Sequence, residues 1–154
     1  MKVVRVGKKA QAALLLTYSV ALLVVTLVVQ GGNGVRVNLE PFADVKRLVD
    51  RVSRGDVLSN AFLYAIVGIA GNLVMFAIWA FLAFKFLDEK GRPTWWSHVA
   101  VIFSGILFSV GIETVQLFLP TRAADVNDVF WNALGSVVGS LTAYFDREVT
   151  LSWE

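Results

Sequence analysis

Residues 57–84 read VLSNAFLYAIVGIAGNLVMFAIWAFLAF and contain no Asp, Glu, Lys or Arg. A helix needs about 20 residues at about 1.5 Å each to cross a hydrocarbon core about 30 Å thick, so this block is long enough to span a membrane. Three more uncharged blocks occupy residues 10–29, 93–112 and 129–145. Together the four blocks predict an all-α fold, a polytopic transmembrane helical bundle with four spans.

The composition supports a membrane environment. Apolar residues make up 56% of the 154 residues and charged residues 17%, whereas soluble domains contain roughly 45–50% and 25%. We expect a single transmembrane domain over residues 1–154 of a multi-pass cell-membrane protein, with spans at about 10–29, 62–84, 97–119 and 128–145. The fourth span is short and contains Asn132, which favours packing against other helices over contact with lipid on all sides.

Two simple counts exclude some chemistry. Cysteine is absent, so disulfides and thiolate sites are excluded. The net charge of +2 comes from basic residues that flank the uncharged blocks, and therefore gives no indication of nucleic-acid binding.

The first block could also be a cleaved signal peptide, because four basic residues precede it: Lys2, Arg5, Lys8 and Lys9. Its apolar run of twenty residues exceeds the usual 7–15 of a signal peptide, and no small-residue cleavage site precedes the polar turn at residues 30–33. We therefore expect a retained membrane anchor.

The distribution of Lys and Arg predicts the orientation. With four spans both termini lie on the same side, and that side carries eight basic residues: Lys2, Arg5, Lys8, Lys9, Lys85, Lys90, Arg92 and Arg147. The other side carries six: Arg36, Lys46, Arg47, Arg51, Arg54 and Arg122. Because four of the eight precede the first span and residues 30–35 contain none, the positive-inside rule places both termini in the cytoplasm. The loops 30–56 and 120–128 then face outward.

The first outward loop contains an amphipathic pattern at about residues 42–54. Apolar residues recur at helical spacing, at Phe42, Val45, Leu48, Val49 and Val52, and charged residues occupy the remaining positions. The pattern predicts a short interfacial helix whose apolar face enters the membrane surface and whose basic residues meet anionic lipid. An ordinary solvated connector gives the same pattern.

Small residues at helical spacing predict close contacts between the spans. They occur at Gly68 and Gly71 in the second span, at Gly105 and Ser109 in the third, and at Gly135 and Gly139 in the fourth. Asn72 lies beside the first group and Asn132 beside the last. If these faces meet, Asn72 completes a polar pocket near the outward turn.

The polar cluster, residues 113–132, holds the best candidates for function. Glu113 lies seven residues before Pro120, about 10 Å down the helix, where an ionised carboxylate costs roughly 2.5–3.5 kcal/mol at most. Such a residue normally has a partner, and Arg122 is the nearest cation in the sequence. Asp125 and Asp128 lie at the start of the fourth span, so helix capping is the simpler explanation for both.

Three motifs together resemble the VanZ-like membrane family. Glu113 and Gln116 are followed by P-x-R-x-x-D-x-x-D-x-x-x-N-x-x-G at residues 120–135, and Asn38-Leu39-Glu40-Pro41-Phe42 and Gly71-Asn72 with Phe76 match two further signatures. Members commonly carry a proline and a glycine shortly after this phenylalanine, where residues 77–80 read AIWA. The resemblance implies a bacterial multi-span cell-membrane protein, in a family whose founding member is associated with resistance to the glycopeptide teicoplanin. It implies no reaction.

Binding is the function that we favour from the sequence. In this hypothesis an outward polar pocket recognises the head group of a membrane lipid, a lipid-linked cell-wall precursor or a glycopeptide, and Arg122 contacts anionic oxygens. The candidate ligand-binding residues are Glu113, Gln116, Arg122, Asp125, Asp128, Asn132, Asn72 and Asn38.

Two other functions use the same residues. An envelope enzyme would use Glu113 as acid or base, and Asp125, Asp128 and Glu113 are the candidate ligands for a divalent cation. No recognised hydrolase motif accompanies them, so we do not favour catalysis and expect no other cofactor. A small transporter or proton path would require a homo-oligomer, because four spans without an inverted repeat make a poor transporter.

Overall fold

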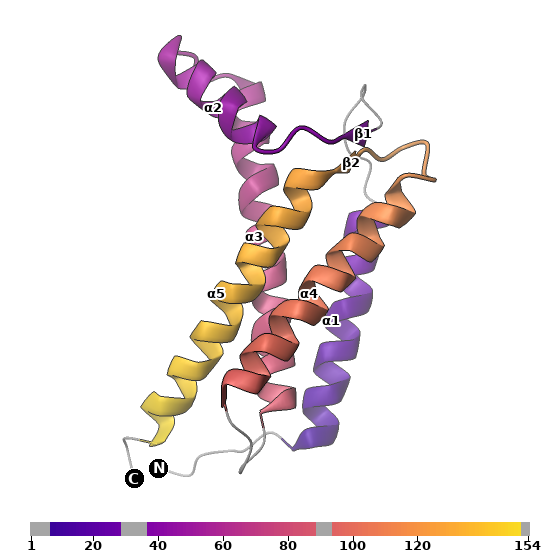
Figure 1. Cartoon of the computed structure of the whole chain (residues 1–154), viewed down its shortest axis with the longest axis vertical. Coiled ribbons are helices and arrows are strands. Elements are labelled where there is room, and N and C mark those ends of the chain that lie inside the picture. Colours follow the sequence, from indigo (N-terminus) through magenta and orange to yellow (C-terminus); the bar gives the residue numbers. More distant parts are fainter. Residues whose placement is uncertain (1–6, 29–36, 89–93, 152–154) are drawn as a thin grey trace.

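This computed structural model describes residues 7–28, 37–88 and 94–151. The elements in chain order are α1 (Lys8–Val28), β1 (Val37–Asn38), α2 (Ala43–Ser53), α3 (Asn60–Leu87), α4 (Thr94–Gln116), β2 (Ala124–Asp125) and α5 (Val126–Leu151). Figure 1 shows α1, α3, α4 and α5 as a bundle, with α2 and the two short strands at one end. The predicted turn at 30–33 and five basic residues used for the orientation lie outside the described residues: Lys2, Arg5, Arg36, Lys90 and Arg92.

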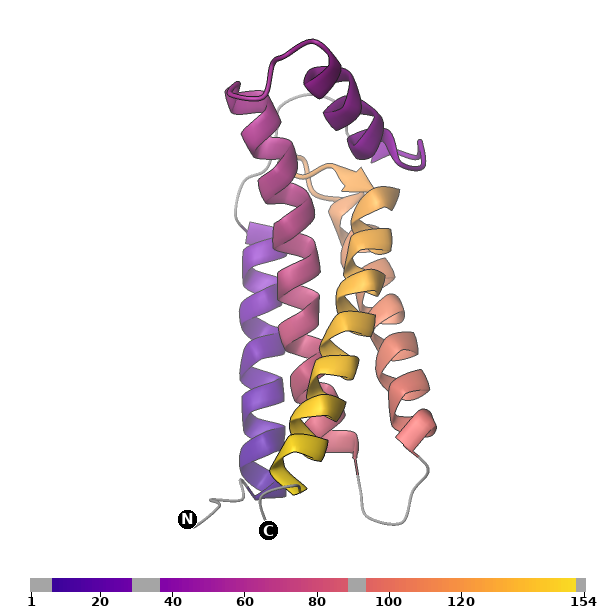
Figure 2. The same cartoon turned by 90° about the vertical axis from the view of Figure 1, so that its left-hand side faces the viewer.

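Three of these helices are long and apolar enough to cross a membrane. They are α1, α3 and α4, with 21, 28 and 23 residues and mean hydropathies of 2.1, 2.2 and 1.8. The helix α5 has 26 residues and runs along the bundle (Figures 1 and 2), but its sequence is less apolar. The predicted helical bundle is confirmed, and three of its four predicted spans meet the criteria of length and composition.

The predicted boundaries differ from the observed ones at α4 and α5. The helix α4 ends at Gln116, three residues before the predicted end, because Phe118 and Leu119 turn back with backbone hydrogen bonds to Val115 and Gln116. The helix α5 continues past its apolar block to Leu151. Helical backbone therefore extends beyond the segment that composition alone marks as a span.

Two glycines bring α3 and α5 into close contact. A Cβ atom on Gly135 would lie 2.3 Å from the carbonyl oxygen of Leu73, and one on Gly139 would lie 2.0 Å from that of Ala77. A Cβ on Gly105 would lie 2.3 Å from Ser136 Oγ. The predicted close packing is confirmed at these positions. It is wrong for Gly68 and Gly71 in α3, where a Cβ would meet nothing within 4 Å.

Hydrogen bonds attach α1 to the rest of the bundle. The Tyr18 hydroxyl donates to the Met75 carbonyl oxygen at 3.1 Å, and Trp79 Nε1 donates to Ser19 Oγ at 3.0 Å. Trp79 also packs with Phe76 and Phe108 in the buried core. The first helix is therefore a packed member of the bundle.

The outer surface of the bundle is apolar. Leu16, Val67 and Phe103 have exposed fractions of 67%, 66% and 61%, and they lie on three different helices. Buried small polar residues lie inside instead, among them Ser97, Ser109, Ser136 and Ser140. This inversion is typical of a helical membrane protein, because lipid solvates apolar side chains and small residues let helices approach.

The predicted amphipathic helix is α2, which lies across the end of the bundle where α3 begins (Figure 2). It ends before Gly55, whose φ of 72° terminates the helix, and Ser59 then caps α3 by accepting a hydrogen bond from the Phe62 N–H at 3.2 Å. Val49 and Val52 on α2 are 63% and 55% exposed. The apolar face of α2 is thus largely uncovered by the bundle.

Candidate functional site

A short parallel strand pair joins the two loops at the α2 end of the bundle. Val37 pairs with Ala124, and Asn38 pairs with Asp125. Strands of two residues leave no periodic signal in a sequence, so the all-α prediction lacked them. The pairing places Asn38 directly beside the polar cluster.

Asp125 is held by three hydrogen bonds. Asn38 Nδ2 donates to Asp125 Oδ2 at 2.8 Å, and the Asn127 backbone N–H and Nδ2 donate to Oδ1 at 2.9 and 2.7 Å. The Asn127 N–H belongs to the first turn of α5, so Asp125 caps this helix. Asp125 therefore fixes the loop geometry, which matches the simpler explanation offered by the sequence.

Asn127 connects the polar cluster to the start of α2, and the sequence analysis missed it. Its Nδ2 donates to the Glu40 carbonyl oxygen at 3.0 Å, and its Oδ1 accepts from the Phe42 N–H. Phe42 has a left-handed φ of 59°. This conformation is unfavourable in free energy for a residue with a bulky side chain. Asn127 is only 3% exposed and stabilises this conformation. Its position between Asp125 and Asp128 was the one sequence feature that could have indicated a structural role.

Glu113 links the end of α4 to β2. Its Oε2 accepts a hydrogen bond from the Asp125 backbone N–H at 2.8 Å. The partner expected from the sequence, Arg122, attracts the Glu113 carboxylate electrostatically, whereas Asp125 and Asp128 repel it. A backbone amide thus provides a direct contact, and the charge of Arg122 adds an electrostatic attraction.

Gln116 and Asn132 lie between helices. Gln116 Nε2 donates to the Thr26 carbonyl oxygen on α1 at 2.8 Å, and Asn132 Nδ2 donates to Ser109 Oγ on α4 at 2.8 Å. Both side chains are buried, at 2% and 3% exposure. The structure therefore places these two candidate ligand-binding residues in interhelical hydrogen bonds.

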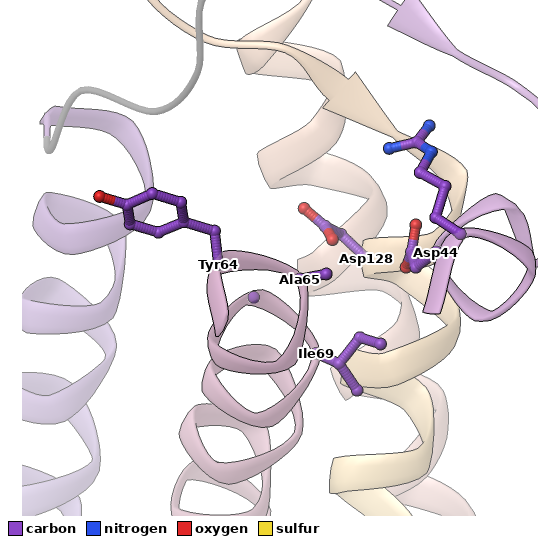
Figure 3. A pocket seen from close by; sticks show the side chains of 7 residues that line it. Asp44, Tyr64, Ala65, Ile69 and Asp128 are labelled. Carbon is purple, nitrogen blue, oxygen red and sulfur yellow. The ribbon is translucent and has the colours of Figure 1, made fainter. Parts of the chain in front are cut away.

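A cavity of about 150 Å³ opens between α2, α3 and the start of α5. Its lining residues are Asp44, Arg47, Tyr64, Ala65, Gly68, Ile69 and Asp128. Figure 3 shows Asp44 and Asp128 lining the same pocket, while the Tyr64 hydroxyl points away. The side chain of Asn72 on α3 favours the ionised form of Asp128.

Asp44 and Arg47 are further residues that the sequence analysis did not select. Trp131 Nε1 on α5 donates to Asp44 Oδ2 at 3.0 Å, which ties α2 to the bundle. The interaction spans 87 residues of sequence, so no local pattern could indicate it.

Within residues 7–28, 37–88 and 94–151, no group of three or more His, Cys, Asp and Glu side chains is arranged to hold a metal ion.

An apolar helical bundle with a network of buried polar contacts at one end is compatible with a membrane protein of the helical class. A family model described as VanZ/LLP1 matches residues 13–147, which is nearly the whole chain. The chain belongs to this family, and the resemblance seen in its motifs is confirmed. Searches of curated proteins and of solved structures found no match.

Proposed function

We propose that this chain is a cell-membrane protein that binds the head group of an envelope lipid or lipid-linked cell-wall precursor. The observation that carries this function is the cavity beside Asp128, where charged side chains from α2 and α5 meet at the end of an otherwise apolar bundle. Charged groups that are partly buried in an apolar helical bundle usually mark a binding site or a pathway for polar molecules. The cavity lies where the head groups of a surrounding bilayer would be found.

The placement in the membrane includes α5 as a fourth span. The contacts at Gly135 and Gly139 hold α5 against α3, and α1 begins at the end of the bundle where α5 finishes (Figure 1). The excess of basic residues on that side favours a cytoplasmic location for it. The α2 end then faces outward, and the exposed Val49 and Val52 of α2 enter the outer interface of the membrane.

The polar cluster has two parts in this function. Glu113, Asp125, Asn38 and Asn127 hold the loops in place through the hydrogen bonds described above. Arg122, whose charge acts on both Glu113 and Asp128, attracts the anionic oxygens of the ligand. The association of the family's founding member with teicoplanin resistance favours a ligand from the cell envelope.

The test is a mass-spectrometric analysis of the lipids that the purified protein retains. We expect one anion-containing lipid class to be enriched in the wild type and reduced about tenfold or more in Arg122→Ala, because a charge-assisted hydrogen bond contributes about 1.5–3 kcal/mol. Glu113→Gln should reduce it as well, because the loop loses its charged acceptor. The control is Lys46→Ala, which removes an exposed cation paired with Glu40 outside the cluster.

Thermal unfolding of each variant shows whether it is folded. Identical lipid profiles in folded wild type, Arg122→Ala and Glu113→Gln would contradict the proposed function.

A further inference from the structure

The size of the cavity beside Asp128 restricts its ligand. Its volume is about 150 Å³. Pockets that bury drug-sized ligands measure about 300–1,000 Å³. The cavity therefore admits a small polar group of a larger molecule, and a disaccharide or a glycopeptide cannot enter it as a whole.

One wall of the cavity is negative. Asp44 and Asp128 both line the cavity, and the charge of Asp44 repels that of Asp128. Trp131 donates to one oxygen of Asp44, and among the described residues no second donor reaches this carboxylate. A cation with several N–H donors, seated between the two carboxylates, would remove the repulsion and complete their hydrogen bonds.

The cavity also contains one positive group. Three basic residues of the α2 segment form ion pairs outside it, Lys46 with Glu40, Arg51 with Asp56, and Arg54 with Asp50. Arg47 lines the cavity, and it forms no ion pair with any residue that the structure describes. Its guanidinium can accept a phosphate through two parallel hydrogen bonds.

We propose that this cavity binds a primary amine joined to a phosphate, the chemistry of a phosphoethanolamine group, with the ammonium between Asp44 and Asp128 and the phosphate at Arg47. This assignment rests on the proposed function and names its ligand class. Negative and positive groups on one small cavity match a zwitterion better than a purely anionic head group, which Asp44 and Asp128 repel. A quaternary ammonium is disfavoured because it has no N–H to donate.

The experiment presents the detergent-purified protein with an equimolar mixture of phosphatidylethanolamine, phosphatidylcholine and phosphatidylglycerol, and counts bound lipids by native mass spectrometry. We expect phosphatidylethanolamine to be enriched about tenfold over both others in the wild type. Arg47→Gln, Asp44→Asn and Asp128→Asn should each abolish this preference. Arg54→Gln, which removes an α2 cation paired with Asp50 outside the cavity, should retain it.

The outcomes separate the two proposals. Enrichment of phosphatidylglycerol or phosphatidylcholine that depends on Arg122 would overturn the ligand class and leave head-group binding intact. If no lipid is enriched, soluble phosphoethanolamine is added and the unfolding temperature is measured. No rise in the unfolding temperature of the wild type would contradict both head-group binding and the ligand class. The informative alternative is a rise in the wild type that is absent in Arg47→Gln. That last result would support the amine-phosphate chemistry and overturn the lipid as its source.

Discussion

Gly139→Ala is expected to destabilise the bundle by about 2–4 kcal/mol, although alanine favours a helix over glycine by about 0.8–1 kcal/mol. The added Cβ would lie 2.0 Å from the Ala77 carbonyl oxygen and 2.7 Å from its carbonyl carbon. These atoms belong to the α3 backbone and cannot rotate aside, so the two helices must separate. Separation removes the buried contacts along the α3–α5 interface.

The matched control for this prediction is Gly111→Ala, a change of the same size in α4. A Cβ at Gly111 meets nothing within 4 Å, so this variant should gain up to about 1 kcal/mol from helix propensity. The measurement is thermal unfolding of the wild type and both variants in the same detergent. Equal unfolding temperatures for Gly139→Ala and Gly111→Ala would show that α3 and α5 do not approach this closely.

Asn127→Ala is expected to release the start of α2 from the bundle. The variant loses the side-chain bonds to the Phe42 N–H, the Glu40 carbonyl oxygen and Asp125 Oδ1. Each bond contributes about 0.5–1.5 kcal/mol net, so we expect a local loss of about 2–4 kcal/mol. The left-handed conformation of Phe42 then lacks its main support.

Hydrogen exchange followed by mass spectrometry measures this release. Peptides that cover residues 37–56 should exchange about thirtyfold faster or more in Asn127→Ala, while peptides from the middle of α3 and α4 should not change. The control is Asn60→Ala at the exposed start of α3, where no comparable bonds are lost. Unchanged protection of residues 37–56 in Asn127→Ala would refute the role assigned to Asn127. The same release would move Asp44 and Arg47, and so should also weaken ligand binding.

Charge and periodicity predicted most of the fold because they act locally. The uncharged block at residues 57–84 identifies α3, since the cost of placing charge in lipid excludes Asp, Glu, Lys and Arg from such a segment. The apolar spacing between Phe42 and Val52 likewise predicts α2. Boundaries were less predictable, because α4 ends in a turn at Phe118 and Leu119 that is as apolar as the helix before it.

The candidate site was predicted only at residues whose burial has an evident cost in free energy. Glu113 was selected because a carboxylate between apolar helices needs a partner, but the hydrogen bond that it accepts comes from a backbone N–H, which has no signature in a sequence. Asp44 and Arg47 appeared to belong only to an amphipathic surface. Their role at the cavity arises from the approach of α2 to α5, a tertiary contact over 87 residues between Asp44 and Trp131.

Head-group binding at the outer membrane surface requires that the α2 end of a four-span bundle faces outward. The chain contains no cysteine, so single substitutions to cysteine can be labelled selectively. Labelling with a membrane-impermeant maleimide on intact cells shows which of these positions face outward. Suitable positions are Thr121 in the exposed turn, Gly7, where a Cβ meets nothing within 4 Å, and Phe145 near the end of α5, which is 63% exposed.

We predict that Thr121→Cys is labelled on intact cells, and that Gly7→Cys and Phe145→Cys are labelled only after the cells are opened. Labelling of both Thr121→Cys and Phe145→Cys from outside would show that α5 does not span the membrane, and the reverse pattern at Thr121 and Gly7 would show that the polar end faces the cytoplasm. Either result would contradict the proposed arrangement.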